Sequence, residues 1–486
     1  IKSIIIGDSN YNQGELNFFT SDLQPSVGSN PGELRVGIKG NPSFGNIRLL
    51  MLGVKNTGNT NASGEVWFNE LRLSDLKNQG GWAAVVNMDT NFADFANISA
   101  TGRRSTIGFG SIEQGPNQRS REDLKQYDVA TNFNMGQLLP KTWGVNVPLS
   151  YSRGEELITP QYDPEYLDLE LETLLDNTED QSRRDELQER AEDYTRRQSV
   201  SVIGLRKERV AQQNQEERKP MPYDVENFAF SGTYNQVDHR DFEIEESLDQ
   251  NVNVGATYDY GFEPFKIEPF KNIKYLDSSE YFRAIKDFNL NLLPTSLSAS
   301  SNITRQYNEQ VYREINLPPG SLGLPKLYQR NYMFDWQYTV NHNLTESLRF
   351  TFNSTNNRIV RNYINDENEQ DNSVGVWDGF FDIGQPNQHY QSLQLNYDLP
   401  FDKIPALKFI RTQYSYTGNF QWQKGSEVRR SLPGIPDLGN SVQNSNTHQI
   451  NGTFDMGTLY NYIGLKKKAD PNSNNRNARM RRPNSQ

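Results

Sequence analysis

Apolar and polar residues alternate with a period of two through much of this chain. Over residues 127–135 and again over 143–151, bulky apolar residues occupy every second position, and small or polar residues lie between them. A proline-containing segment, 136–142, separates the two runs. Because successive side chains of a strand point to opposite faces of a sheet, the two runs predict a β-hairpin with one apolar and one polar face.

The same pattern recurs later, most clearly over residues 332–341 and 410–423. The apolar positions there are rich in aromatic residues, whereas the alternate positions carry mainly Asn, Gln, Ser and Thr, and the charged residues keep to that second parity. Soluble sandwiches usually carry more Lys and Glu outside and rely on Val, Ile and Leu inside. An aromatic face opposite an amide-rich face is typical of a transmembrane β-barrel wall between lipid and a watery lumen. The pattern therefore favours such a barrel over stacked soluble sandwiches.

The two faces supply the candidate site residues. The positions expected to face lipid are Phe133, Trp143, Phe334, Trp336, Tyr414, Tyr416, Phe420 and Trp422. The positions expected to line the lumen are Asn132, Asn134, Asn146, Gln337, Gln413, Asn419, Gln421 and Gln423. A lining of neutral amides binds nothing strongly, so it suits the passage of varied protein cargo.

The alternating segments predict an all-β chain with thirteen candidate spanning strands. Most are near the roughly nine to eleven residues that a tilted strand needs to cross a bilayer. They lie near 82–91, 96–107, 127–135, 143–151, 199–207, 227–235, 251–260, 296–306, 331–341, 347–355, 389–398, 409–423 and 447–456. We therefore expect residues 81–457 to form transmembrane antiparallel β-barrel strands with loop insertions.

The segment 1–80 differs from the rest of the chain. Short apolar runs at 34–38, 47–54 and 65–73 are separated by Gly, Asn and Pro turns. Short strands with regular turn signals predict a small N-terminal β-sandwich or jelly roll.

The two ends of the chain carry further signals. Residues 1–6 already have the pattern of a strand, without an initiating Met or a signal peptide, so we expect the chain to be an internal piece of a longer protein. Residues 458–486 are basic and rich in Asn, Ser and Pro. This composition predicts a disordered or periplasmic segment.

Two insertions between the strands predict helices. Asp163 followed by Pro164 is a helix start, and leucine-rich and then highly charged sequence follows it, which predicts a helical insertion over about 163–197. A shorter helix is expected over 278–287. We expect the charged part of the first insertion to be a solvated decoration of a loop.

Loop lengths predict which way the wall faces. In bacterial barrels the periplasmic turns are short and the outer loops are long. The alternation is consistent throughout if 138–140, 293–295, 341–343 and 400–405 lie at the periplasmic rim. This assignment places the N-terminal segment outside and the basic tail inside.

Composition limits the class of protein further. Hydrophobic residues make up 34% of the 486 residues, which is low for a globular core, and aromatic residues make up 11%, which fits membrane-interface girdles. No segment approaches the roughly 20 apolar residues of a membrane helix, so any spanning requires strands. The lack of cysteine excludes disulfides and thiolate metal sites. A net charge of -11 argues against nucleic-acid binding.

Catalytic chemistry has little support in the sequence. The histidines His239, His342, His389 and His448 are far apart in sequence, in or beside predicted loops, and no metal-binding His-Glu-x-x-His motif is present. We therefore expect no enzyme activity, no cofactor and no metal.

Four parts of the chain have a familiar sequence: 64–73, 286–294, 343–348 and 444–452 with 459–461. They resemble the SprA/Sov family, the very large outer-membrane translocons of the Bacteroidetes type 9 secretion system, which are also linked to gliding motility. The resemblance implies a single-chain barrel of exceptional strand number, so that thirteen strands are only part of its wall. It also implies a cell-surface exit, secreted protein cargo, a shuttle β-barrel at a lateral opening, a plug protein and periplasmic or inner-membrane motor components.

The leading hypothesis is a segment of a protein-conducting channel in the outer membrane. A second hypothesis is a soluble surface adhesin or carbohydrate-binding β-protein, in which Trp67, Trp82, Trp336 and Trp422 would be binding platforms or core residues. A third is a different large outer-membrane barrel that inserts lipopolysaccharide or takes up nutrients.

Overall fold

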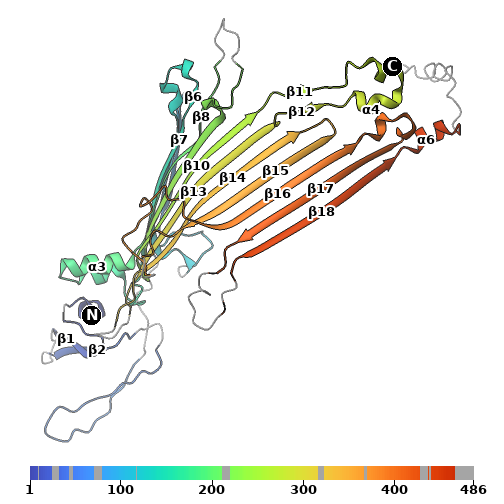
Figure 1. The fold of residues 1–486 in the computed structure, drawn as a ribbon. Helices are drawn as coiled ribbons and strands as arrows, with labels where there is room; N and C mark the ends of the chain where they lie inside the picture. The colour runs from blue at the N-terminus through green and yellow to red at the C-terminus, as the bar shows by residue number, and fades with distance from the viewer. Residues whose placement is uncertain are drawn as a thin grey trace, which may run out of the picture.

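One antiparallel sheet dominates the computed structural model of the chain (Figure 1). The structure describes residues 1–8, 10–23, 32–42, 47–69, 79–115, 118–210, 219–315, 322–365, 369–426, 436 and 439–465. Within these residues the sheet contains fourteen strands. The protein is therefore mainly β, as the two-residue alternation predicts.

Thirteen strands of the sheet follow one another as hydrogen-bonded neighbours in chain order, which is the arrangement that short connections favour. They are β3 (Ala83–Phe92), β4 (Ala96–Ser105), β5 (Glu122–Asn134), β7 (Pro148–Pro160), β8 (Asp193–Lys207), β9 (Phe228–Arg240), β10 (Ile244–Gly261), β13 (Ser296–Tyr312), β14 (Leu327–Asn343), β15 (Leu348–Val360), β16 (Gln385–Leu399), β17 (Ile410–Gln423) and β18 (Ser441–Phe454). The two-residue β6 (Val145–Asn146) pairs with β8.

Short elements lie outside this sheet. The helices are α1 (Lys2–Gly7), α2 (Leu171–Asp176), α3 (Gln181–Ala191), α4 (Arg283–Lys286) and α6 (Met456–Tyr462). Two small sheets pair β1 (Leu16–Leu23) with β2 (Gly32–Lys39) and β11 (Lys266–Ile267) with β12 (Leu290–Asn291). Short 3-10 turns are η3 (Met135–Leu138), η4 (Lys141–Trp143), η5 (Val225–Asn227), η6 (Lys274–Ser278), η7 (Glu280–Phe282), η8 (Pro400–Lys403) and η9 (Pro405–Leu407).

Each of the thirteen predicted segments overlaps a strand of the long path, so their existence is confirmed. Their lengths are not, because β10 has 18 residues and β13 and β14 have 17 each. A tilted strand needs only roughly nine to eleven residues to cross a bilayer. Pairing with equally long neighbours keeps these strands regular well beyond that length.

The strands end on two opposite borders of the sheet. We call the border with α2 and α3 the α3 end and the border with α4 and α6 the α4 end (Figure 1). The four segments predicted to share one rim lie together at the α4 end, in or next to the connections that follow β5, β10, β14 and β16, whereas the N-terminal segment reaches β3 from the α3 end. Their common location is confirmed, and the membrane side of each border stays a prediction.

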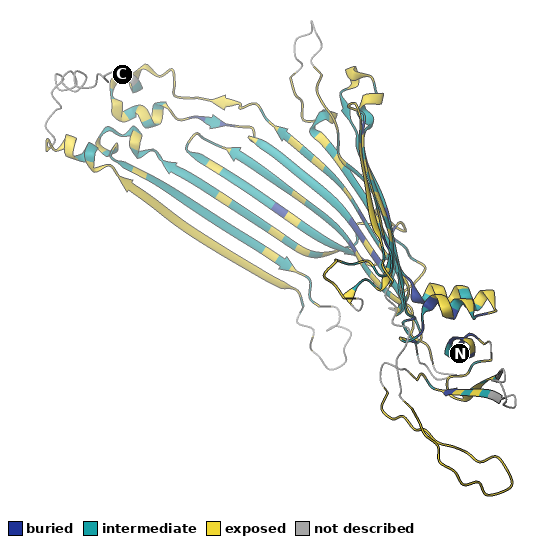
Figure 2. Cartoon of the chain, turned by 180° about the vertical axis from the view of Figure 1, so that it is seen from behind, coloured by how far each residue is buried: buried dark blue, intermediate teal, exposed yellow. Residues whose placement is uncertain are grey.

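The first and last strands of the path form open edges. β3 and β18 each have a hydrogen-bonded neighbour on one side only among the described residues. All residues of β18 and nearly all of β3 are exposed, and Figure 2 shows β18 exposed along its whole length. The described residues therefore form an open, curved sheet, in which the two edges do not meet.

The start of the chain is a helix, so the strand predicted for residues 1–6 is wrong. Lys2–Gly7 forms α1, whose Ile5 and Ile6 are buried. A strand at this position would need a neighbouring strand as hydrogen-bonding partner, whereas the short helix forms hydrogen bonds within itself and turns Ile6 into the cluster with Leu174 and Leu187.

The segment 1–80 contains the hairpin β1–β2, and β2 covers the run predicted at 34–38. The strand expected over 47–54 does not form, and neither does the described part of 65–73; residues 70–73 lie outside the described part of the chain. Leu49, Met51 and Trp67 are 77%, 82% and 87% exposed. Among the described residues no strand lies beside these apolar runs, so their backbone N–H and C=O groups have no partners for the hydrogen bonds of a sheet. The β-sandwich as a domain stays a prediction.

The helical insertion is shorter than predicted. Asp163 does not start a helix; its Oδ1 accepts hydrogen bonds from the backbone N–H groups of Glu165 and Tyr166 in a turn. α2 begins only at Leu171, and α3 ends at Ala191 because the following residues pair with β7 as the start of β8. The second helix, predicted over 278–287, divides into η6, η7 and the short α4.

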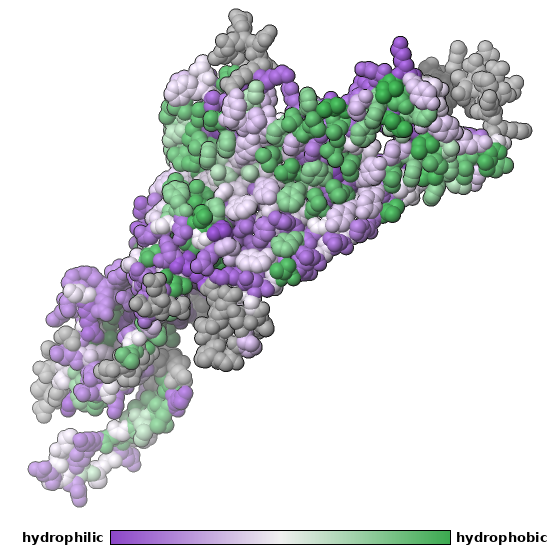
Figure 3. Space-filling view, viewed as in Figure 1, coloured by the Kyte–Doolittle hydropathy of each residue, from purple (hydrophilic) through white to green (hydrophobic). Residues whose placement is uncertain are grey.

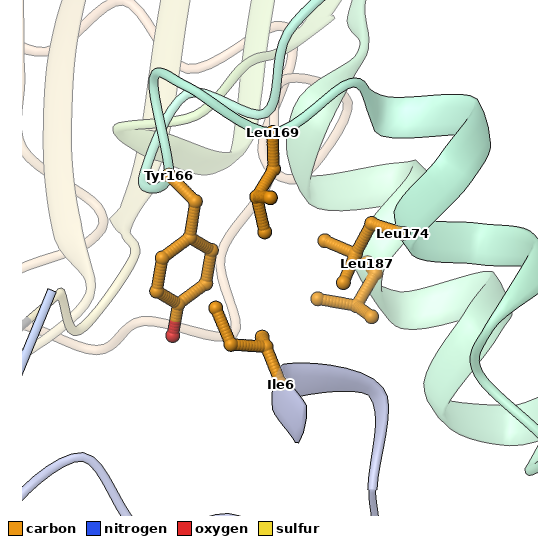
Figure 4. Close-up of a cluster of buried hydrophobic side chains, with 5 residues drawn as sticks. All are labelled: Ile6, Tyr166, Leu169, Leu174 and Leu187. Carbon is orange, nitrogen blue, oxygen red and sulfur yellow. The ribbon is translucent and has the colours of Figure 1, made fainter. Parts of the chain in front are cut away.

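The charged helix α3 is not a solvated decoration, because its apolar side anchors the N-terminus. Leu187 of α3 belongs to a buried cluster with Ile6, Tyr166, Leu169 and Leu174 (Figure 4). The high charge of this segment predicted that the helix is surrounded by water. Two of its residues, Leu187 and Ala191, are buried instead. This cluster holds α1 at the α3 end of the sheet.

The basic segment 458–486 begins within α6, so its first residues are helical and not disordered. Its lysines and arginines, from 466 onward, lie outside the described residues. In the part of the chain that the structure describes, no helix combines the length and the apolar composition needed to cross a membrane.

Candidate functional site

The cross-strand pairing divides the sheet into two chemically different faces. Directly paired residues of an antiparallel sheet share a face, so the register can be followed from strand to strand. It places seven predicted lipid-facing residues on one face, which we call the aromatic face: Phe133, Phe334, Trp336, Tyr414, Tyr416, Phe420 and Trp422. Lipid contact itself stays a prediction.

Trp143 does not lie on a strand face. It ends η4, and Gly144 follows it with a φ of 62°, in the left-handed region that favours glycine. The alternation around Trp143 predicted a strand, but the strand begins only at Val145, after this turn.

The opposite face, which we call the amide face, contains all eight predicted lumen residues. The register groups Asn132, Asn134, Asn146, Gln337, Gln413, Asn419, Gln421 and Gln423 there. β8 contains a bulge between Val202 and Leu205, where one extra residue is inserted. The extra residue keeps Leu205 on the same face as its partner Phe230, so the assignment of faces continues through the bulge. Contact with a watery lumen stays a prediction.

Side chains on the amide face hydrogen-bond to one another across the strands. Asn419 Oδ1 accepts from the Ser392 hydroxyl at 2.8 Å, and its Nδ2 donates to Ser445 at 3.3 Å, which links β16, β17 and β18. Thr339 donates to Asn353 at 2.8 Å in the same way. These amides and hydroxyls thus use part of their hydrogen-bonding capacity on each other, which leaves a neutral polar surface.

The aromatic face changes character along the strands. Its part near the α4 end contains apolar pairs such as Val340 opposite Phe352. Toward the α3 end it carries ion pairs, including Arg196 with Asp238 at 3.0 Å. Figure 3, which views one side of the sheet, shows hydrophobic residues gathered toward the α4 end and hydrophilic residues toward α3. The face therefore consists of an apolar band and a polar margin.

Three arginines on the aromatic face were not identified by the sequence analysis. They are Arg305 on β13, Arg330 on β14 and Arg358 on β15, and the register places each of them on the aromatic face. The alternation over 332–341 and 410–423 predicted that charged residues lie on the amide face. That prediction is wrong at these three positions, as it is at Arg196 and Asp238. The signal that could have identified them is an arginine at one of the alternate strand positions that otherwise carry apolar or aromatic residues.

Charged pairs fix the loops at both ends of the sheet. At the α4 end, Lys266 of β11 donates to Glu346 in the β14–β15 turn at 3.0 Å, and this hydrogen bond lowers the pKa of Glu346. At the α3 end, Arg190 of α3 pairs with Glu165 at 2.7 Å. These contacts are structural and do not converge on a cavity.

The four histidines are not brought together. All four lie within strands, on β9, β14, β16 and β18, where the sequence analysis expected them in or beside loops. They bond to nearby groups, for example His342 to the Asn291 carbonyl and His448 to the Tyr414 hydroxyl, both at 2.8 Å. Within the described residues no group of three or more His, Asp or Glu is arranged to hold a metal ion.

Comparison with known sequences identifies one family. Residues 16–175 match the family SprA_N, described as motility related/secretion protein. The match runs from β1 to α2 and so includes the hairpin, the first strands of the large sheet and much of the insertion that holds α1. No curated protein matches the chain.

Proposed function

Since this chain is of the SprA/Sov type, within a motility- and secretion-related family, we propose that its sheet is part of the wall of a protein-conducting channel in the bacterial outer membrane. The amide face would line the path of secreted protein cargo, and the aromatic face would contact lipid. A surface adhesin, a lipopolysaccharide-inserting barrel and a nutrient transporter have no comparable family support.

One observation carries the proposal: within one continuously paired sheet, the register keeps the predicted aromatic residues of β5, β14 and β17 on one face and the predicted amide residues of the same strands on the other. A soluble sandwich would need a second sheet against its apolar face. Among the described residues no second large sheet covers the aromatic face. Outer-membrane barrels solve the same problem with lipid, which contacts the apolar band directly.

The open edges support a larger wall. In lipid, the backbone groups along β3 and β18 must find partners, since each unpaired group costs several kcal/mol. Further strands that pair with both edges would satisfy them, which agrees with the exceptional strand number that the resemblance implies. Barrels of up to about 36 strands exist. The closed barrel is part of the proposal.

We propose, from the four segments predicted to share the periplasmic rim, that the α4 end lies in the periplasm and the α3 end at the cell surface. The lengths of the connections do not decide the orientation by themselves, because the long connection 262–295 lies at the α4 end and the short connection 241–243 at the α3 end. By resemblance, the periplasmic side would meet a plug protein and motor components, and a lateral opening would pass cargo to a shuttle β-barrel. We propose that the chain itself catalyses no reaction, so the driving force for export and for gliding would come from these partners.

Single cysteines along 409–423 test the lipid and water assignment, because the chain has no cysteine of its own. In outer-membrane vesicles, a water-soluble maleimide should label Gln413→Cys, Asn419→Cys and Gln421→Cys rapidly. Tyr414→Cys, Tyr416→Cys and Phe420→Cys should resist that reagent and be protected by lipid. Equal labelling of the amide-face and aromatic-face cysteines would contradict the proposal.

Deletion of the gene tests the export function separately. Secreted cargo should accumulate in the periplasm, while outer-membrane permeability to nutrients and lipopolysaccharide content should stay normal. Normal secretion after deletion would contradict the channel, and a lipopolysaccharide defect alone would favour a lipopolysaccharide-inserting barrel.

A further inference from the structure

The connection between β15 and β16 folds back over the aromatic face and is held there by the three arginines named above. Arg330 donates to the carbonyls of Asn372 and Val374 at 3.2 and 3.1 Å. Arg358 donates to those of Ile383 and Gly384 at 2.7 and 2.6 Å. We call the segment 372–384 the strap.

Arg305 makes the central contacts. Its guanidinium is fully buried and donates to the strap carbonyls of Gly379, Phe380 and Asp382 at 3.5, 2.8 and 3.2 Å. It also donates to the carbonyls of Thr304 and Met333 at 3.2 Å each. A buried cation is costly unless its donors are satisfied. Here backbone carbonyls satisfy most of the guanidinium, so this site specifies the path of the strap.

An apolar cluster seals the strap onto the sheet. Val376 of the strap is 2% exposed and packs with Val252, Tyr307, Tyr332 and Val360 on four neighbouring strands. The strap is therefore a fixed part of the aromatic face.

The strap turns large apolar side chains outward. Trp377, Phe381 and Ile383 are 59%, 82% and 54% exposed. The Trp377 ring lies against Tyr234 and Phe380, with centroids 5.8 and 5.5 Å apart, so one side of the indole is supported. The arginines donate to backbone carbonyls of the strap, and Arg305 also lies over the Phe380 ring, 5.7 Å from its centroid. The anchoring therefore does not use the three exposed side chains.

The position of the strap matches the margin of the apolar band. For a strand tilted by about 40°, the stretch from Ser296 to Arg305 rises roughly 20 Å along the membrane normal, and that from Leu348 to Val360 roughly 30 Å. The outward apolar band of a barrel is about 25 Å tall. If the α4 ends mark one membrane surface, the strap lies at the opposite one.

We infer that the strap is an interfacial lipid anchor, which inserts Trp377 and Phe381 at the boundary between lipid headgroups and acyl chains on the α3 side. The inference rests on the proposed membrane location. A lipid surface is the expected occupant because the exposed rings continue the apolar band on the same face, and Trp with its N–H suits a boundary that is apolar on one side and wet on the other.

A depth measurement on the full-length protein in liposomes tests the anchor. Phe381→Cys, at an exposed position, accepts a fluorophore without disturbing the fold. Its emission should be quenched by lipids that carry a nitroxide near the headgroup and several-fold less by iodide in water. Ser373→Cys, at the exposed polar start of the strap, should show the reverse. Leu393→Cys, within the apolar band of β16, should be quenched by nitroxides near the acyl-chain centre.

The outcomes separate the anchor from the channel wall. If Leu393→Cys reports lipid while Phe381→Cys is quenched by iodide, the anchor is refuted and the wall stands. If Phe381→Cys is shielded from lipid and iodide quenchers alike, a protein covers the strap and the anchor is refuted. If Leu393→Cys itself is reached by iodide and not by lipid quenchers, the membrane location fails, and the anchor fails with it.

Discussion

Leu393 and Gln394 are adjacent in β16 but belong to opposite surfaces of the sheet. Leu393 lies between Phe352 and Gly418 on the aromatic face. Gln394 lies between Thr351 and Thr417 on the amide face. One step along the backbone thus separates an apolar environment from a polar one, and the pair offers a matched test of the two faces.

Leu393→Arg should destabilise the folded protein in lipid by about 2–4 kcal/mol, the cost of an arginine near the middle of a bilayer. Gln394→Arg should cost less than ~1 kcal/mol, because its side chain would enter water. Urea unfolding in lipid vesicles, followed by tryptophan fluorescence, measures both. Similar losses for the two variants would contradict the assignment of the faces.

Arg305→Lys should loosen the strap. An ammonium group cannot reproduce the planar set of donors that binds several carbonyls at once, and hydrogen bonds to a charged group contribute about 1.5–3 kcal/mol each. We expect amide hydrogen exchange of 372–384 to accelerate by at least roughly tenfold.

Arg349→Lys is the control for that change, because Arg349 is half exposed and its described ion pair is with Asp398 at 2.8 Å. We expect Arg349→Lys to change the opening free energy of the strap, measured by hydrogen exchange of 372–384, by less than ~1 kcal/mol. Unchanged exchange in Arg305→Lys would show that the strap does not depend on this guanidinium.

Gly7→Ala should displace α1 from its site. A Cβ at Gly7 would lie 2.5 Å from the Asn177 carbonyl oxygen, which is backbone and cannot move freely. We expect a local cost of about 1–3 kcal/mol and faster proteolysis within residues 1–8. Gly14→Ala meets only the Asn12 side chain at 3.4 Å and should leave proteolysis unchanged. Equal behaviour of the two variants would refute the docking.

The docking of α1 should weaken at alkaline pH. Burial raises the pKa of the Tyr166 hydroxyl, and the neighbouring Glu165 carboxylate raises it further. The folded form therefore favours the protonated tyrosine, so its contribution is complete below the unfolded pKa of about 10 and is lost as pH rises above that value.

A spin label at Ile4→Cys, on the exposed side of α1, measures this loss as increased mobility above about pH 10. Tyr166→Phe should remove most of the dependence. Tyr11 retains a smaller one, since burial also raises its pKa. A mobility that does not change with pH in the unmodified protein would contradict the role of Tyr166.

The sequence predicted the large sheet because its information is local. Strand alternation repeats at every second residue, and strands that pair with their chain neighbours need no long-range information beyond the turn between them. For this reason the thirteen strands and the face of fifteen of the sixteen site residues agree with the register. Trp143 was misplaced because a turn with a left-handed glycine interrupts the alternation immediately before Val145.

Contacts between segments far apart in sequence could not be predicted from the local alternation. The pattern of Ile4, Ile5 and Ile6 favours a strand, yet α1 forms because Tyr166 and Leu187, distant in the chain, provide a buried site for Ile6. Likewise, the charge pattern of α3 gave no sign that Leu187 is part of a core.

The amino-acid sequence by itself determined the two-faced strands, their order and the chemistry of each face, since alternation and turn residues act within a few positions. The tertiary structure alone decided the docking of α1, the end of α3 and the path of the strap. There the free energy depends on filling a cavity or satisfying a buried guanidinium with carbonyls from another loop, and no short stretch of sequence encodes either condition.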